Sequence, residues 1–319
     1  MTAVQNAGPT ADDLAYIRFR APDLEKMRVF LEDFGFKVMP GETEDGVPAL
    51  FSRGKGGAPV IHIVEQGDPT FLGIGFKMAS MESLKALSEY DGASEICEIL
   101  APGGGYRVRF EDPNGYAIDG VYGYIERAQA PPFVRQPMNT MAARLRRNSP
   151  IRLPRDKPVP VNRIGHCVLN VRSFRGSEAW FKERFGLLTS EEFYVDDKSQ
   201  VVGGFLRCNR GDIPTDHHTV ALVQSQQTGI NHVAFEVDDW DSVMLGHDYL
   251  GSKGYKSYWG VGKHILGSQI FDYWEDPYGN VHEHFTDGDV FDESHVPTLE
   301  SVDNLLGVQW GPLPPDKDL

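Results

Sequence analysis

The chain has 319 residues, of which 40% are hydrophobic and 24% are charged, and its formal net charge is −15. This length suits about two domains on a prior of about 150 residues each, and the composition is that of a globular protein. The negative charge argues against nucleic acid and anionic membranes as partners, because both favour a basic surface.

The cysteines and the apolar segments point to a reducing compartment. Cys97, Cys167 and Cys208 are odd in number and lack CxxC spacing, so neither a disulfide framework nor a thiolate zinc site is expected. No apolar run approaches the roughly 18 residues of a membrane span, and no signal-peptide pattern opens the chain. We therefore expect a cytoplasmic enzyme with no membrane partner.

The first half begins with a strand and a helix. Residues 14–19 form a strand-like run, and residues 22–34 have the apolar spacing of a helix that ends at Gly35. A second apolar strand follows at residues 72–78. The tetrapeptide Asp-Pro-Asn-Gly at residues 112–115 then predicts a tight turn, because proline at the second position and glycine at the fourth suit a type I turn.

A connector rich in proline and arginine is predicted between residues 126 and 162. Its cluster of Arg144, Arg146 and Arg147 resembles a basic patch. Because the protein is acidic, we expect these arginines to bind the body of the protein itself rather than an external partner.

The second half repeats the order of the first. Residues 164–171 form a predicted strand and residues 177–185 a predicted helix, which stops at Gly186, 151 positions after Gly35. Residues 231–237 match the strand at 72–78, and the Asp-Pro-Tyr-Gly at 276–279 repeats the turn. The sequence therefore predicts a duplicated α+β module, with modules at 1–125 and 163–290, the connector at 126–162 and a tail at 291–319 that packs across a module or a subunit contact.

Three residues of the second module make a candidate metal site. His166, His232 and Glu283 each lie on a short apolar, strand-like segment. Two imidazoles and one carboxylate are the ligand set that holds non-haem Fe(II) while leaving coordination positions open for substrate and O2. A single histidine near a strand start is more often structural, so the set has to be tested as a set.

The duplication supplies that test, because structural residues should recur in both modules and ligands need not. Tyr16 stands opposite His166, Gly73 opposite His232, and Asp119 opposite Glu283. The strands and turns are repeated, but the three candidate ligands are found only in the second module. This pattern favours a metal site in that module.

These residues resemble the type I extradiol ring-cleaving dioxygenases of the vicinal oxygen chelate superfamily, which also includes glyoxalase I. The resemblance covers about residues 10–290 and extends to three further positions. His218 lies in Asp-His-His-Thr-Val-Ala-Leu, His264 ends Gly-Lys-His, and Tyr273 lies ten residues before Glu283. The resemblance implies two tandem modules of repeated βαβββ units with mixed curved sheets, the first of them without a metal.

The resemblance also implies an activity. It implies ring cleavage of a catechol-type substrate by O2 at Fe(II), with Mn(II) as a possible replacement, to a ring-opened semialdehyde in aromatic degradation. His218 would move a proton, as imidazole titrates near neutral pH, and His264 and Tyr273 would orient a substrate oxygen. Residues 265–271 contain no Lys or Arg, which favours an uncharged catechol. A homo-oligomer is expected.

Some alternatives stay open at the level of sequence. Adjacent strand residues face opposite sides, so only one of His217 and His218 can face the metal, and family position selects His218. The same period leaves His282 and His284 as packing or surface residues beside Glu283. A glyoxalase-type metal isomerase or lyase and a metal-free binding protein are the alternative functions. The first usually draws ligands from both modules, and the second has no need of His218, His264 and Tyr273.

Overall fold

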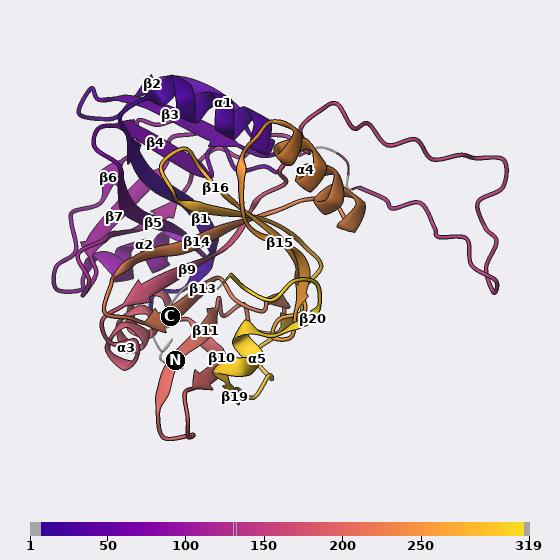
Figure 1. The fold of residues 1–319 in the computed structure, drawn as a ribbon. Helices are drawn as coiled ribbons and strands as arrows, with labels where there is room; N and C mark the ends of the chain where they lie inside the picture. Colours follow the sequence, from indigo (N-terminus) through magenta and orange to yellow (C-terminus); the bar gives the residue numbers. More distant parts are fainter. Residues whose placement is uncertain (1–7, 130, 132, 316–319) are drawn as a thin grey trace, which may run out of the picture.

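The two halves of the chain form two mixed sheets with helices, as the duplicated α+β pattern predicts. The computed structural model describes residues 8–129, 131 and 133–315. Figure 1 shows the first module in indigo to purple and the second in rose to yellow, packed side by side. No helix in these residues is long and apolar enough to span a membrane.

The first module is an eight-stranded sheet in the order β2-β3-β4-β1-β5-β8-β7-β6. Two βαβββ units therefore lie next to each other, with the antiparallel pair β1 and β5 in the middle. The elements are β1 (Ala11–Ala21), α1 (Leu24–Phe34), β2 (Lys37–Glu42), β3 (Pro48–Arg53), β4 (His62–Gln66), β5 (Thr70–Met78), α2 (Met81–Ser88), β6 (Cys97–Glu98), β7 (Tyr106–Glu111) and β8 (Ala117–Tyr122).

The second module repeats this order and adds strands at both edges, giving β19-β10-β11-β13-β9-β14-β17-β16-β15-β20. Strands β12 and β18 form a separate pair. The elements are β9 (Ile164–Val171), α3 (Phe174–Phe185), β10 (Leu188–Tyr194), β11 (Val201–Arg207), β12 (Thr215–Asp216), β13 (Val220–Gln224), β14 (Gly229–Glu236), α4 (Trp240–Ser252), β15 (Lys256–His264), β16 (Ile270–Glu275), β17 (Val281–Thr286), β18 (Val290–Phe291), β19 (Thr298–Ser301), α5 (Val302–Leu306) and β20 (Val308–Trp310).

Local signals fix the helix ends and the turns. Helix α1 begins after Asp23, whose side chain accepts a hydrogen bond from the Lys26 N–H, and ends at Gly35 with φ of 111°. A Cβ at Gly35 would lie 1.9 Å from the carbonyl oxygen of Val159, so only glycine fits there. Gly186 ends α3 in the left-handed region, as predicted. Both Asp-Pro-x-Gly turns are closed by a hydrogen bond from the glycine N–H to the aspartate carbonyl.

One apolar core extends across both modules and contains Phe34, Phe36 and Phe235. Buried histidines from the two modules meet among these rings, where Nε2 of His62 lies 3.0 Å from Nε2 of His282. His284 donates from Nε2 to the Phe34 carbonyl oxygen over 2.8 Å. His282 and His284 are therefore packing residues at the contact between the modules, one of the two roles predicted for them.

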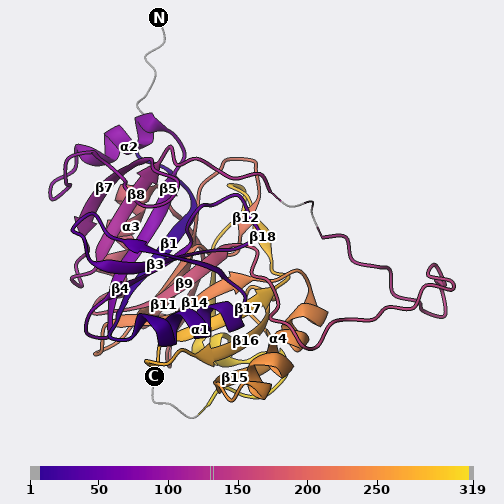
Figure 2. The same ribbon diagram turned by 90° about the horizontal axis from the view of Figure 1, so that it is seen from above.

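The connector is an extended segment, but its arginines do not lie where the prediction put them. It has no helix or strand among its described residues, and its central part extends away from the body (Figures 1 and 2). Arg144 and Arg147 are exposed, and neither they nor Arg146 form an ion pair within the described part of the chain. The prediction that this cluster binds the acidic body is wrong, because the segment lies too far out; Arg135 and Arg155 make the ion pairs to α4 instead.

The tail packs across the second module, as one of its predicted positions required. Strand β19 pairs in parallel with β10, and β20 pairs antiparallel with β15. β10 and β15 are the two outermost strands of the duplicated sheet, so the short helix α5 links the strands that the tail adds at its two edges.

Candidate metal centre

Strand register places the candidate ligands next to one another. In the second sheet His166 on β9 pairs with Ala234 on β14, and Ala234 pairs with Glu283 on β17. His232 lies two residues before Ala234 and therefore on the same face of the sheet. In the first sheet Tyr16, Gly75 and Asp119 make the same pairings. The predicted correspondence of the two modules thus holds in the strand pairing.

The three side chains converge on one point. Nε2 of His166 lies 3.2 Å from Oε2 of Glu283, and Nε2 of His232 lies 3.4 Å from the same oxygen. One ligand atom from each residue lies within 4.8 Å of the others. Two ligands about 2.1 Å from one metal ion and at right angles are about 3.0 Å apart, so this spacing suits three ligands on one face of an ion.

The charge state of the cluster fits a cation. Glu283 is fully buried, and neither of its oxygens accepts a hydrogen bond from the described residues. Burial raises the pKa of Glu283 to about 7, and it lowers the pKa of His166 to about 3 and that of His232 to about 4. The imidazoles are therefore neutral and offer lone pairs. A divalent ion among these groups would compensate a carboxylate that is otherwise buried without a partner.

Asn231 fixes the orientation of one candidate ligand. Its Oδ1 lies 2.9 Å from Nδ1 of His232. Because an amide oxygen can only accept, Nδ1 of His232 must carry the proton and Nε2, which faces Glu283, must carry the lone pair. This is the arrangement in which a histidine binds a metal through Nε2. The sequence reasoning did not identify Asn231, although its position directly before His232 was visible.

A series of side-chain hydrogen bonds ends at His218. Oε2 of Glu191 lies 3.0 Å from Nε2 of His217, and Nδ1 of His217 lies 3.0 Å from Nδ1 of His218. The carboxylate accepts from His217, whose Nδ1 can then accept from His218. That leaves Nε2 of His218 as an acceptor. His218 lines the cavity over the candidate ligands and its ring centroid lies 4.1 Å from that of His166, whereas His217 is turned toward Glu191.

The remaining two predicted residues form a pair beside His232. Nε2 of His264 lies 2.9 Å from the Tyr273 hydroxyl oxygen, and the Tyr273 ring meets the His232 ring edge-on at 5.0 Å. Burial lowers the pKa of His264 to about 3. Trp259 and Phe271 pack against the imidazole and hold it in place. The pair is rigid and neutral.

These groups share a cavity of about 360 Å³ in the second module. Its walls are mostly apolar, and none of the described lining residues is Lys or Arg. Leu305 and Leu306 of α5 and Pro314 and Pro315 after it close one side. Five of the six residues predicted from the sequence therefore line this cavity, and the sixth, Glu283, contacts two of them, His166 and His232. The cavity can hold a ring-sized apolar ligand against the candidate metal ligands.

The second module resembles a known class of protein. The model of the Glyoxalase/Bleomycin resistance protein/Dioxygenase superfamily matches residues 163–283, which are nearly all of the second module. The match contains all three candidate metal ligands.

Individual relatives narrow the comparison. Metapyrocatechase 2 of Cupriavidus necator is 32% identical over 157 residues, which are 48% of this chain and 46% of the relative. The chain thus aligns with about half of that relative's length. Metapyrocatechase of Pseudomonas sp. (strain CF600) is 27% identical over 232 residues, 70% of this chain and 69% of that protein.

Solved structures support the fold over nearly the whole chain. The Mn(II)-bound glyoxalase from Novosphingobium aromaticivorans has a TM-score of 0.75 at 22% identity and covers 96% of this chain and 93% of its own. Homoprotocatechuate 2,3-dioxygenase from Arthrobacter globiformis has a TM-score of 0.73 at 18% identity, with 95% and 90% covered. At these identities the likeness shows the fold alone, and it includes both an oxygenase and a glyoxalase.

Proposed function

We propose that this chain is an extradiol dioxygenase that cleaves the ring of a catecholic aromatic with O2, using Fe(II) held by His166, His232 and Glu283. The observation that carries the proposal is the convergence of two imidazoles on the buried Glu283 carboxylate, which accepts no hydrogen bond from the described residues. Ferrous iron bound there would offer positions for both catechol oxygens and for O2, and a path for electrons between them. Mn(II) accepts the same ligands.

His218 is the proposed proton carrier. A catechol must give up a proton when it binds as a chelate, and Nε2 of His218 is the free acceptor left by the chain from Glu191 through His217. Burial lowers the pKa of His218 well below its ordinary value, so the ring is neutral before substrate binds and ready to accept. The same nitrogen can later return the proton to the oxygen that leaves the ring.

His264 and Tyr273 are the proposed positioning pair. The Tyr273 hydroxyl and Nε2 of His264 are held together at 2.9 Å on the side of the cavity next to His232. A substrate hydroxyl at this wall would be oriented by two neutral polar groups without a change in net charge. The apolar walls exclude water from the reacting atoms, which strengthens these contacts.

The cavity also suggests the kind of catechol. The described lining contains no cation to meet a ring carboxylate, and Val168, Phe193, Phe205 and Leu305 supply an apolar wall. A hydrocarbon substituent would be buried there, whereas a carboxylate would lose its hydration without a partner. We propose an uncharged catechol with an alkyl or aryl substituent as the substrate.

The test is oxygen consumption by protein that has been reconstituted anaerobically with Fe(II). Catechol, an alkyl catechol and a carboxylated catechol are supplied in turn, and the visible spectrum is followed at the same time. Oxygen uptake that matches the yellow ring-opened semialdehyde, fastest with the alkyl catechol, is expected. Metal binding without uptake for any catechol would contradict ring cleavage and point to a glyoxalase-type isomerase or lyase.

A further inference from the structure

The first module has a cavity of its own at the place that corresponds to the metal centre. Strand register puts Tyr16 where the second module has His166, and Arg109 where it has Tyr273. Val60 likewise takes the position of His218. All three residues line the cavity of the first module. This module therefore has a cavity at the equivalent place, but residues that are not metal ligands stand at these positions.

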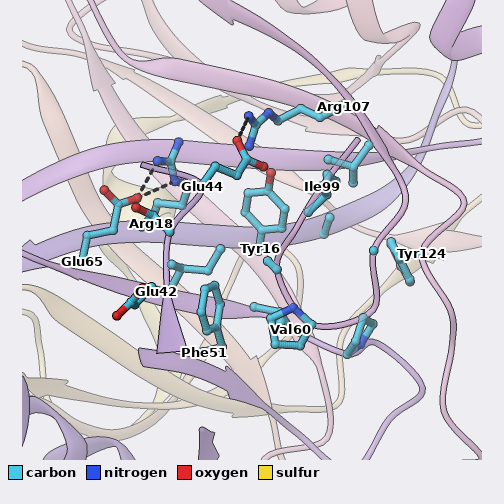
Figure 3. Close-up of a pocket in the computed structure, with 18 of the residues that line it drawn as sticks. Tyr16, Arg18, Glu42, Glu44, Phe51, Val60, Glu65, Ile99, Arg107 and Tyr124 are labelled. Carbon is cyan, nitrogen blue, oxygen red and sulfur yellow. Dashed lines mark hydrogen bonds and ion pairs between the residues drawn. The ribbon is translucent and has the colours of Figure 1, made fainter. Parts of the chain in front are cut away.

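The size of this cavity suits one aromatic ring. Its volume is about 140 Å³, close to the roughly 150 Å³ of an engineered apolar cavity that binds benzene. Four buried apolar side chains, Phe51, Val60, Ile63 and Val121, line it, and the Tyr16 ring stands beside them (Figure 3). A flat apolar ligand can therefore bury its faces here.

Most charges around the cavity are already paired within the sheet. Asp119, which is fully buried, accepts from the Tyr16 hydroxyl at 2.7 Å and from two guanidinium nitrogens of Arg109 at 2.6 and 2.7 Å. Arg18 donates from Nη2 to Glu65 over 2.5 Å, and this pair is mostly buried. These groups form a fixed network and offer no vacant charge to a ligand.

Arg107 differs from these residues. It projects from β7 toward the cavity, its Nε is buried, and no described residue accepts a hydrogen bond from that atom. Its ion-pair partner is Glu44, 2.7 Å away, which lies on the exposed turn between β2 and β3 (Figure 3). Strand β2 is one edge of the sheet and β7 lies next to the other edge, so this contact spans the mouth of the cavity.

We propose that the first module binds a single-ring aromatic carboxylate, with the ring on the apolar floor and the carboxylate on Arg107 in place of Glu44. The Glu44 carboxylate already occupies the position that such an anion would take, and the buried Nε of Arg107 supplies a second donor for a bidentate contact. Glu44 lies on an exposed turn and 33% of its side chain is exposed, so its carboxylate can move into water when an external carboxylate takes its place on Arg107.

The second cavity provides a contrast in ligand charge. No Lys or Arg is among its described lining residues, whereas the first is lined by four arginines and four acidic residues: Arg18, Arg20, Arg107, Arg109, Glu42, Glu44, Asp45 and Glu65. An aromatic carboxylate should therefore select the first module and an uncharged catechol the second. This inference does not depend on the proposed ring cleavage.

The experiment is a calorimetric titration of the full chain, without added metal, with benzoate and separately with the uncharged benzamide. We expect saturable binding of one benzoate per chain and no saturable binding of benzamide. Arg107→Gln should lower the affinity for benzoate by about tenfold or more, since it removes a charge-assisted contact. Glu44→Gln should raise the affinity for benzoate about two- to fivefold, because the charged side chain that competes for Arg107 is then absent.

Glu283→Ala is the matched control in the other module and should leave benzoate affinity unchanged. The higher benzoate affinity expected for Glu44→Gln does not arise from misfolding, because a misfolded protein would not bind benzoate more tightly. Absence of saturable benzoate binding at millimolar concentration, equal binding of benzamide, or unchanged affinity in the folded Arg107→Gln and Glu44→Gln proteins would each overturn the proposal.

Discussion

The two modules bury a carboxylate at equivalent points of their two sheets but surround it with different groups. In the first, Asp119 is surrounded by donors from Tyr16 and Arg109. In the second, Glu283 lies between two neutral imidazoles and accepts no hydrogen bond within the described residues. A satisfied buried charge stabilises its own module, whereas an unsatisfied one needs something from outside. The carboxylate at this strand position is therefore a structural residue in the first module and a candidate binding residue in the second.

The largest effect is expected when both carboxylates are removed in turn. Glu283→Ala should reduce metal affinity by more than about a hundredfold, because a direct ligand matters at least as much as the groups that orient it. The metal-free variant should be as stable as the parent or more so, since an uncompensated buried charge has gone. Metal content after gel filtration and thermal unfolding are the two measurements.

Asp119→Ala is the partner experiment. It leaves Arg109 and the Tyr16 hydroxyl without their acceptor and should cost about 2–4 kcal/mol of unfolding free energy, with metal content unchanged. If the two variants shifted stability in the same direction, the distinction between the two carboxylates would be lost.

His218→Phe should lower the rate of catechol turnover by about 10²–10⁴-fold with metal content unchanged. The reason is that the proton from substrate then has no acceptor. Metal content and turnover are measured on the same sample. His295→Ala, outside both cavities, is the matched control and should keep full activity. Full activity of the His218 variant would remove its assigned role.

Asn231→Ala should weaken metal binding by about 10–100-fold, since His232 loses the acceptor that fixes its tautomer. The corresponding residue of the first module is Leu72, which has no ligand to orient. Titration with a competing chelator gives the affinity. Asn231→Asp keeps a hydrogen-bond acceptor at this position and should retain most of the metal affinity. Equal affinities for the alanine variant and the parent would mean that Asn231 has no orienting role.

Leu305→Ala should have the smallest effect. It shortens the apolar wall contributed by α5 and should raise KM for an alkyl catechol by about two- to tenfold, because less apolar surface is buried. KM for unsubstituted catechol should change little, which serves as the internal control. A similar change for both substrates would place the substituent elsewhere in the cavity.

Much of this arrangement could be predicted because the sequence is duplicated, so the two halves can be compared position by position. The helix ends at Gly35 and Gly186, the two Asp-Pro-x-Gly turns and the two-sheet α+β fold follow from short-range patterns. The meeting of His166, His232 and Glu283 also followed, since strand position selects one face of a sheet.

Other features could not be predicted because they join residues that no local pattern relates. The contact of Glu191 with His217 joins strand β10 to the loop before β13, 26 positions later, and the pair of Arg107 with Glu44 spans 63 positions. The arginines of the connector were misjudged for a related reason. Composition gives the sign of a segment's charge but not how far the segment extends from the acidic surface.

The pairing of β19 and β20 has a consequence for synthesis on the ribosome. The first sheet is made from residues 11–122 and can close soon after they emerge, whereas both outer strands of the second sheet come from residues 298–310. Until those residues are available, β10 and β15 are open edges of the kind that recruit other chains. The second module should therefore be the one that needs protection by chaperones, and cleavage before residue 298 should produce an aggregating protein.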